Sequence, residues 1–366
     1  MASTKYGAGR WGTARFILTQ AMPSSGDRRH ERVNATSATS SSPWTRGSQK
    51  ALLRLALSRP ARRLGRAFLV GVGVMLLAFA LIRLIPGDPA YILLGDQATP
   101  EAVARLRETL GTNGTLPEQL AAYVGRLSHG DLGTSMATGQ SVTSIVARAL
   151  PVTLSLIAMT LVMASILALP LGVAAAMYRR AWFGQVFRVG ASLLIGMPVF
   201  FSGLVLILLL SMRLGLAPVA GYAWGVPETL RYLWLPALTI CTTLVPVLAR
   251  VLQSSVVDTM EQEFVESAIV RGLPGRVLIW RYLLRPSLAP TIGLLAYIVG
   301  SLLGSAVLVE MMFGLPGIGT ALVEAVAVRD YTAVQGILLV FGLIIVVVGY
   351  AADTLSSVLD PRTATR

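Results

Sequence analysis

Few side chains in this sequence of 366 residues could make or break covalent bonds. Neither of its two lysines, Lys5 and Lys50, is preceded by glycine, which excludes the phosphate-binding pattern G-x-x-x-x-G-K-[ST]. The two histidines, His30 and His129, lie outside the long apolar runs, and Cys241 is the only cysteine. An HExxH zinc pair, a thiolate metal cage and an intrachain disulfide are therefore excluded. We expect no catalytic site, no metal site and no ATP hydrolysis by this chain alone.

Charged side chains at or near membrane depth are also rare. Carriers driven by protons or sodium ions usually place ionisable groups or broken helices near the middle of the membrane. Gly196 and Pro198 could break the third apolar run, but no carboxylate accompanies them. A self-powered carrier or channel is therefore disfavoured, although it stays open as an alternative of a different class. The charged residues that we expect at or near membrane depth are Arg83, Arg213, Arg250, Glu310 and Asp353, each close to the end of a run.

The composition indicates that lipid is the main solvent of the chain. Hydrophobic residues make up 54% of it and charged residues 13%, which is about half the charged share of a soluble domain. Uncharged apolar runs of about 17 to 25 residues, the first of them short, predict an all-α membrane protein with six transmembrane helices. The runs are Ala67 to Ile82, Leu150 to Tyr178, Val189 to Met212, Tyr232 to Ala249, Pro286 to Val309 and Tyr331 to Ala352.

The basic residues predict which helix ends face the cytoplasm. Arginines gather in residues 1–66, in the 179–188 loop and in the 271–285 segment, all on one side of the predicted spans. The positive-inside rule makes that side cytoplasmic. The 86–149 segment, where acidic residues outnumber basic ones, falls on the opposite side. We therefore expect a multi-pass protein of the cell inner membrane with both termini in the cytoplasm.

Residues 1–60 form a basic N-terminal extension that we expect to be cytoplasmic and disordered, because its Ser, Thr, Gly and Arg show no apolar period. Most of the net charge of +13 lies in residues 1–66. A basic segment before a span is typical of a cytoplasmic retention signal and a contact for anionic lipid, which we favour over nucleic-acid binding. The extension lacks the apolar stretch of a secretory signal. We expect transport to proceed without it.

The extracytoplasmic 86–149 segment contains helix signals. Thr99 suits the N-cap of a helix that begins at Pro100, and Gly111 suits its end. A second helix is predicted around Leu116 to Leu127. The segment is expected to be either a small outer cap with room for a soluble partner or a lid over the helix ends.

The cytoplasmic 258–285 segment interrupts two apolar runs with two short helix patterns. From Asp258 to Arg271 apolar residues recur at three- and four-residue spacing, with Phe264, Val265, Ala268 and Ile269 on one exposed face. Gly272 suits a left-handed C-cap and Pro274 the first turn of a second helix that ends near Leu284. Such a helix–turn–helix is either a plug for a groove in a partner protein or an amphipathic elbow on lipid headgroups. Periodicity alone slightly favours the elbow.

The residues Glu266-Ser267-Ala268-Ile269-Val270-Arg271-Gly272 resemble the E-A-A-x-x-x-G loop of ABC importer permeases, with Ser267 in place of the first alanine. Further motifs resemble the B-type permease subunit of the dipeptide, oligopeptide and nickel transport family, over roughly residues 60–362. These motifs are LIRLIPGDPA (81–90), HGDLGTS (129–135), RALPVTLSL (148–156), GMPVFFSGLVLILL (196–209), LAP (288–290), FGLPGIG (313–319), RDYTAVQG (329–336) and LDPR (359–362).

The resemblance implies the transmembrane domain of a type I ABC importer, occupying residues 61–366. Its implied partners are a second permease subunit, two cytoplasmic ATPase subunits that bind the ATP, an extracytoplasmic substrate-binding protein and membrane lipid. No cofactor of its own and no nucleic acid are implied. The residues implied to couple this chain to an ATPase are Glu266, Ser267, Ala268, Gly272, Leu273 and Pro274.

Gly196, Pro198 and Glu310 are the residues that we expect at the translocation pathway. Each has a structural alternative, since Gly196 and Pro198 could form a kink that serves packing alone, and Glu310 could equally anchor the turn that follows it. Asp88 is interpreted as a turn residue. Because no histidine lies in a span and the methionines are scattered, we favour di- or oligopeptides as substrate, with nickel or a nickel chelate as the alternative.

Overall fold

The structure of the chain, a computed structural model, describes residues 64–80, 89–95, 98–111 and 113–359. Within those ranges the only strand-like pairing is an isolated β-bridge between Thr134 and Ser141. All other regular structure in those ranges is helical, which confirms the all-α class. Arg83, Asp88 and the extension at residues 1–60 lie outside the described residues.

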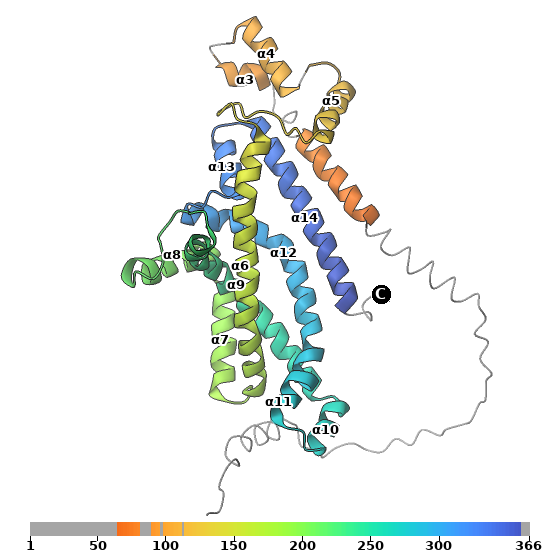
Figure 1. Ribbon diagram of the computed structural model, residues 1–366, viewed down its shortest axis with the longest axis vertical. Helices are drawn as coiled ribbons and strands as arrows, with labels where there is room; N and C mark the ends of the chain where they lie inside the picture. Colours follow the sequence, from red (N-terminus) through yellow and green to blue (C-terminus); the bar gives the residue numbers. More distant parts are fainter. Residues whose placement is uncertain (1–63, 81–88, 96–97, 112, 360–366) are drawn as a thin grey trace, which may run out of the picture.

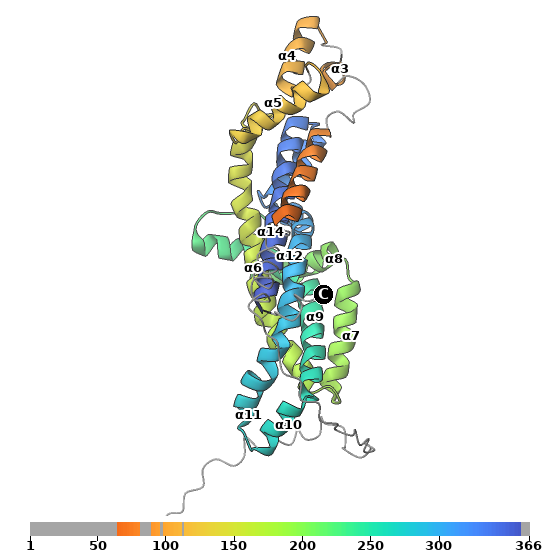
Figure 2. The ribbon, with the colours of Figure 1, turned by 90° about the vertical axis from the view of Figure 1, so that its right-hand side faces the viewer.

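The helices form an elongated molecule with a distinct group of short helices at each end. In both views α3, α4 and α5 lie at one end of the long axis, and α10 and α11 lie at the other (Figures 1 and 2). A helix over Leu64–Ala80 comes first. It is followed by α3 (Pro89–Leu94), α4 (Pro100–Leu110), α5 (Leu116–Ser128), α6 (Val142–Met177), α7 (Trp182–Gly196), α8 (Val199–Leu206), the π-helix η2 (Ile207–Arg213), α9 (Val226–Met260), α10 (Glu263–Val270), α11 (Gly275–Val277), the π-helix η3 (Leu278–Leu284), α12 (Arg285–Phe313), α13 (Ile318–Ala327) and α14 (Tyr331–Leu359).

Among the described residues, three helices are long and apolar enough to cross a membrane, namely α6, α9 and the Tyr331–Ala351 part of α14. Two bent pairs raise the number to five if each is one span: Trp182–Gly196 with Val199–Arg213, and Gly275–Leu295 with Tyr297–Phe313. The helix Leu64–Ala80 covers most of the first predicted run, whose end lies outside the described ranges. Each predicted run thus overlaps a helix or a bent pair, and the count of six stays a prediction.

The centre of the molecule is built from α6, α9 and α12, whose buried apolar side chains form one cluster. Leu156 of α6, Leu248 of α9 and Leu303 of α12 are almost completely buried there. At Gly172 the helices α6 and α9 approach so closely that an added Cβ would lie 2.9 Å from the carbonyl oxygen of Ala249. Small residues permit this kind of backbone contact between membrane helices. The three helices therefore form a packed connection between the two ends of the molecule.

The third predicted span is broken where the sequence suggested a break. α7 ends at Gly196, Pro198 has extended backbone angles, and α8 starts at Val199 with a change of direction of 107° between the two segments. After the break α8 packs against α9 and α12. A Cβ at Gly203 would lie 2.5 Å from the sulfur of Met312 on α12. The missing side chain at Gly203 therefore lets the redirected segment contact the central helices.

Helix α4 begins and ends at the predicted caps, and α5 covers the second predicted helix. Thr99 accepts a hydrogen bond from the Ala102 N–H at 3.2 Å, and Gly111 ends α4 with φ +64°. At the start of α5, the Thr115 N–H donates to the Glu118 carboxylate at 2.8 Å. This hydrogen bond holds the pKa of Glu118 below its ordinary value. The two helices of this segment are thus fixed by local sequence signals.

Asp330, directly before α14, links the 129–141 loop to α14 through hydrogen bonds. The buried Ser135 hydroxyl donates to its carboxylate at 2.5 Å, and the Ala137 N–H donates to the same oxygen at 3.3 Å. Its other oxygen accepts the Ala333 N–H at 3.0 Å, as an N-cap does. Two of the motifs noted in the sequence, HGDLGTS and RDYTAVQG, are therefore joined in space although they lie far apart in the chain.

Candidate functional site

The helix–turn–helix at 258–285 begins later than its sequence pattern predicted. Asp258 belongs to the last turn of α9, which ends at Met260, and α10 starts only at Glu263 after the extended Gln262. The predicted start at Asp258 was therefore wrong. Met260 is 3% exposed because it packs in the cluster beneath α10. The apolar period of α9 continues to that residue, so the sequence alone showed no boundary before it.

The turn between the two helices has the predicted left-handed glycine. Gly272 has φ +74°, and its N–H donates to the carbonyl of Ile269 at 2.9 Å, while the Leu273 N–H reaches the carbonyl of Ala268 at 3.4 Å. These hydrogen bonds end α10 in the manner of a glycine C-cap. Pro274 then precedes α11 with φ −63° and ψ 140°. From Gly275 the chain continues through α11 and η3 into α12, so the second short helix is continuous with a predicted span.

The predicted exposed stripe on the first helix is mostly buried by the chain's own residues. Val265 and Ala268 are each 1% exposed and lie in a cluster with side chains of α6, α9 and η3. The prediction of an exposed stripe was therefore wrong for these two residues. The turn at Gly272 folds α10 back against η3, and periodicity cannot tell whether an apolar face is covered by the same chain or by a partner.

A different set of side chains at this end faces outward. Val270 is 81% exposed, Trp280 is 64% exposed and Phe264 is 45% exposed. The Phe264 ring stacks on that of Tyr282 with centroids 6.5 Å apart, which holds it at the edge of η3. Apolar side chains are therefore exposed at this end of the molecule, near the exposed Glu263 and Glu266 of α10.

The motif residues divide into an outward-facing group and an inward-facing group. Glu266, Ser267, Gly272 and Pro274 are exposed, whereas Ala268 is buried and Leu273 is half-buried in the cluster under α10. The buried members fix α10 on the spans above it. The exposed carboxylate of Glu266 and the exposed turn are free of the chain's own core, so this arrangement can contact another protein.

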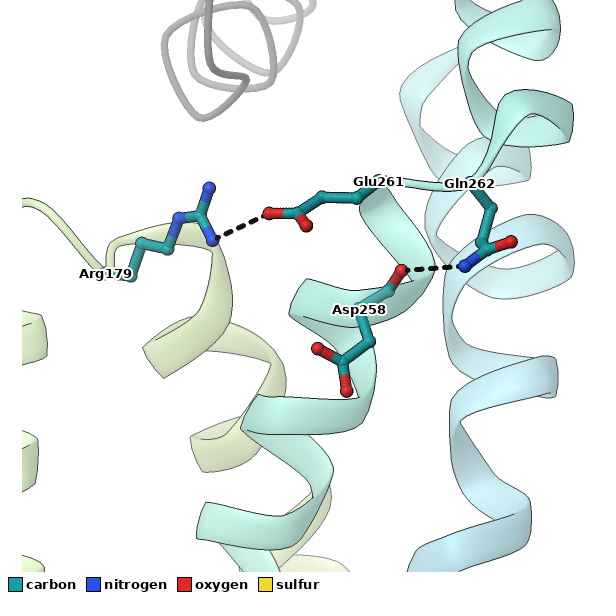
Figure 3. Close-up of polar contacts among 4 residues, drawn as sticks. All are labelled: Arg179, Asp258, Glu261 and Gln262. Atoms are coloured by element: carbon teal, nitrogen blue, oxygen red, sulfur yellow. Dashed lines mark hydrogen bonds and ion pairs between the residues drawn. The ribbon is translucent and has the colours of Figure 1, made fainter.

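A contact that the sequence did not suggest joins the short connection between α6 and α7 to the start of this region. Arg179 lies 3.7 Å from the carboxylate of Glu261, the residue that follows α9 (Figure 3). Next to it, the side-chain amide of Gln262 donates to the carbonyl of Asp258 at 3.4 Å (Figure 3). An ion pair of this exposure contributes at most about 1 kcal/mol. Arg179 was noted in the sequence only for its effect on orientation.

Glu310 is completely buried near the end of α12, and its carboxyl group is surrounded by donors. One oxygen accepts from the Thr153 hydroxyl of α6 at 2.5 Å. The other accepts from the N–H groups of Gly319 and Thr320, at 2.9 and 3.2 Å, in the first turn of α13. The same Thr153 oxygen accepts the Ile318 N–H at 2.9 Å. Glu310 and Thr153 thus hold the N-terminus of α13, where unpaired N–H groups favour a carboxylate.

The glycines of the FGLPGIG motif make room for this carboxyl group. A Cβ on Gly317 would lie 2.2 Å from the carboxyl carbon of Glu310. A Cβ on Gly319 would lie 2.7 Å from the backbone of Val307 and 2.8 Å from a carboxyl oxygen of Glu310. Real Cβ atoms do not approach heavy atoms that closely. The two glycines therefore shape the pocket that Glu310 occupies.

The three residues expected at the pathway do not lie together at one site. The hydrogen bonds described for Glu310 go to α6 and α13, whereas Gly196 and Pro198 are exposed at the break between α7 and α8. A Cβ on Gly196 would meet no heavy atom within 4 Å. Among the described residues, no group of three His, Cys, Asp or Glu side chains could hold a metal ion.

Comparisons with known proteins agree over almost the whole described chain. The family described as "Binding-protein-dependent transport system inner membrane component" matches residues 168–365, and the family of its N-terminal region matches residues 57–157. The chain is 34% identical to a putative peptide transport system permease protein of Brucella suis biovar 1, covering 82% of this chain and 97% of that protein.

Two further relatives have similar names and similar coverage. A di/tripeptide transport system permease protein of Pseudomonas aeruginosa is 34% identical, over 84% of this chain and 98% of its own length. A probable D,D-dipeptide transport system permease protein of Escherichia coli is 34% identical, over 80% of this chain and 94% of its own. The family match over residues 168–365 includes Gly272, Glu310, Gly317 and Gly319.

Proposed function

Because this chain belongs to the binding-protein-dependent transport system inner membrane component family, we propose that it passes di- or oligopeptides across the membrane. It is a multi-pass inner-membrane permease subunit of an ABC importer. ATPase and binding-protein components work with such a subunit. We further propose which surface of the chain contacts the ATPase, where the substrate pathway runs and how the partner subunits are arranged around the chain.

The geometry of α10 and of the turn that follows it supports a role of this region in ATPase coupling. Glu266 and the turn at Gly272 are exposed, while Val265 and Ala268 are fixed in a cluster with α6, α9 and η3. A force applied to the exposed side therefore reaches several spans at once. We assign ATPase coupling to Glu266, Ser267, Ala268, Gly272, Leu273 and Pro274, in the 258–285 coupling region.

The proposed partners are assigned to the two ends of the molecule and supply the ATP-binding site that the sequence of this chain does not contain. No phosphate-binding loop is present in the sequence, so ATP would be bound and hydrolysed by two separate ATPase subunits below α10. A second permease subunit would complete the membrane part. The substrate-binding protein would approach the 86–149 segment, whose helices lie at the end opposite to α10 (Figures 1 and 2). Both termini would be cytoplasmic.

The pathway is proposed to run beside the break at Gly196 and Pro198. Backbone that leaves the helical path at membrane depth is tolerated where it lines a cavity or is covered by protein, and both residues are exposed in this chain. Glu310 would contribute to the pathway through α13, whose N-terminus it holds. We assign the domain 61–366 to transport on this basis.

The proposed peptide substrate is supported by the names of the relatives, which refer to peptides, dipeptides or tripeptides. Nickel is the competing cargo. The two histidines lie outside the predicted spans, and the described residues contain no cluster of metal ligands. Neither observation favours a metal path.

Reconstitution in proteoliposomes tests the proposal. The chain is combined with its second permease, the two ATPases and the binding protein, and uptake of a labelled dipeptide and of nickel is measured with and without ATP. We expect dipeptide uptake that requires ATP and the binding protein, and no hydrolysis by the purified chain alone. Uptake of nickel in place of peptide would overturn the substrate. Uptake by the chain alone without ATP would overturn the coupling and support a self-powered carrier.

A further inference from the structure

Two buried hydroxyl groups are in contact between the last turn of α9 and the first turn of α12, next to the coupling region. The Thr259 Oγ1 of α9 lies 2.9 Å from the Ser287 Oγ of α12, and either atom can be the donor. Ser287 is completely buried and Thr259 is 9% exposed. The pair lies in a stretch where the surrounding core side chains are apolar. A directional contact in such surroundings fixes one arrangement of the two helices.

Each hydroxyl also lies within hydrogen-bond distance of backbone carbonyl oxygens. Because each hydroxyl carries one hydrogen, one of the two donates to the other hydroxyl and the second donates to a carbonyl oxygen. The Thr259 hydroxyl is 2.7 Å from the carbonyl oxygen of Ser255, one turn earlier on α9. The Ser287 hydroxyl is 3.2 Å from the same Ser255 carbonyl and 2.7 Å from the carbonyl of Leu283 in the π-helix η3. The Ser255 carbonyl is therefore an acceptor shared by both helices. We define Ser255, Thr259 and Ser287 as the hydroxyl joint.

The position of the joint relates it to α10. The chain enters α10 from α9 through Glu261 and Gln262, and leaves it through Gly272 to Pro274 into the helix that continues as α12. Thr259 thus lies a few residues before the entry into α10, whereas α11 and η3 separate the exit at Pro274 from Ser287. Thr259 lies just before the entry, and Ser287 lies just after the π-helix that packs on α10.

We propose that the hydroxyl joint makes α9 and α12 move together when α10 is displaced, so that Thr259 and Ser287 are positioning residues for coupled transport. This inference rests on the proposed function of α10 as the ATPase contact. Apolar side chains in the same cluster, such as Val256 and Leu283, hold the helices together without direction and permit them to slide. The hydroxyl pair removes that freedom, because its bond is made in one register.

Thr259→Val tests the proposal, since valine keeps the shape of threonine and removes the hydroxyl. Thr259→Ser keeps the hydroxyl and is the conservative rescue. Ser287→Ala removes the other member of the pair. Thr291→Val is the matched control, because Thr291 is a buried threonine one turn further along α12 whose hydroxyl has no hydrogen-bond partner among the described residues.

The measurement is the amount of labelled dipeptide taken up per ATP hydrolysed by the reconstituted complex, with binding of the ATPases checked by co-purification. We expect Thr259→Val and Ser287→Ala to keep the ATPases and to lower this ratio about three- to tenfold, the factor expected for one lost hydrogen bond. Thr259→Ser and Thr291→Val should stay near the unchanged protein. The double variant Thr259→Val with Ser287→Ala should have the same uptake per ATP as either single variant, because both substitutions remove the same contact.

Three results would overturn the inference. One is an unchanged ratio in Thr259→Val and Ser287→Ala while the unchanged protein transports normally. Another is an equal loss in Thr291→Val, which would show a general sensitivity to lost hydroxyls. The third is loss of the ATPases from both variants, which would place the defect in docking. Absence of ATP-dependent uptake in the unchanged protein would instead refute the proposed function, and the inference with it.

Discussion

Glu310 has no exposed surface, and the helices α6, α12 and α13 meet at its carboxyl group. The carboxyl group receives the hydroxyl of Thr153 and two N–H groups of α13. A buried acceptor with this many donors is costly to change, since any donor left without a partner keeps its full desolvation penalty. We therefore regard Glu310 first as an anchor for α13, whose further effect on the pathway is a proposal.

Glu310→Gln tests this anchor by replacing one carboxyl oxygen with an amide group while keeping the shape. We expect the free energy of unfolding in detergent to fall by about 1.5 to 3 kcal/mol, because an amide nitrogen replaces one acceptor oxygen. Glu324→Gln is the control, since Glu324 is exposed on α13 and exposed substitutions usually change stability by less than about 0.5 kcal/mol. Equal unfolding curves for Glu310→Gln and the unchanged protein would contradict the anchor.

Gly317→Ala tests the glycine pocket around the same carboxyl group. The new Cβ would lie 2.2 Å from the carboxyl carbon of Glu310, so we expect a loss of about 1 to 3 kcal/mol from overpacking. Gly300→Ala is the control, because a Cβ at that position of α12 meets no heavy atom within 4 Å. The loss should shrink in a Glu310→Ala background, where the clashing group is gone. A loss that is independent of Glu310 would show another cause.

The sequence could locate Glu310 beside a glycine motif but could not identify its partner. Thr153 lies 157 residues earlier in the chain within an apolar run, and a threonine in a span has many uses. The two interpretations of Glu310, pathway or turn, were therefore equally open. Only the meeting of α6, α12 and α13 shows which donors surround the carboxyl group.

At the scale of elements, Gly272 is the residue on which the shape of the coupling region depends. Its φ of +74° is in the left-handed region, where a β-branched residue adds about 1 to 2 kcal/mol of strain. We expect Gly272→Val to insert in the membrane and to pair with the second permease, but to bind the ATPases less well. Substrate-stimulated hydrolysis and uptake should fall together. Co-purification, hydrolysis and uptake on one preparation measure all three effects.

Gly304→Val is the matched control for Gly272→Val. Gly304 is exposed on α12, its backbone is helical and a Cβ there meets no heavy atom within 4 Å, so binding of the ATPases and uptake should be unchanged. The lipid-elbow interpretation expects little change in either variant. A Gly272→Val complex that keeps its ATPases and transports at the normal rate would remove the coupling role from this region.

The elements show where sequence reasoning succeeds and where it ends. Apolar length located the spans, and the pair Gly196 and Pro198 located the break, because lipid and backbone geometry act locally. The covered face of α10 was missed at Val265 and Ala268, since it depends on how the chain folds back after Gly272. The start of α10 was missed for a different reason, because the apolar period of α9 continues to Met260 without a boundary in the sequence.

At the scale of the whole molecule, the central helices connect two ends of different character. The outer end has capped helices and the Asp330 contact between the 129–141 loop and α14. The opposite end has the short α10, a glycine turn and a π-helix, which is a rare element often found at functional sites. Because Val265 and Ala268 fix α10 in a buried cluster with α6, α9 and η3, we expect a displacement of α10 to be passed on to those helices.

The last prediction concerns residues 2–56, which precede the part of the chain that the family matches, residues 57–157 and 168–365. Their deletion should leave uptake near normal once the amount in the membrane is matched. Orientation should also be kept, because Arg59, Arg62, Arg63 and Arg66 still precede the first span and basic residues next to a span set its direction. Replacing those four arginines with glutamine in the shortened chain should reduce correct insertion, as measured by protease protection. Loss of uptake by the shortened chain at matched membrane level would show that the extension takes part in transport beyond helping insertion.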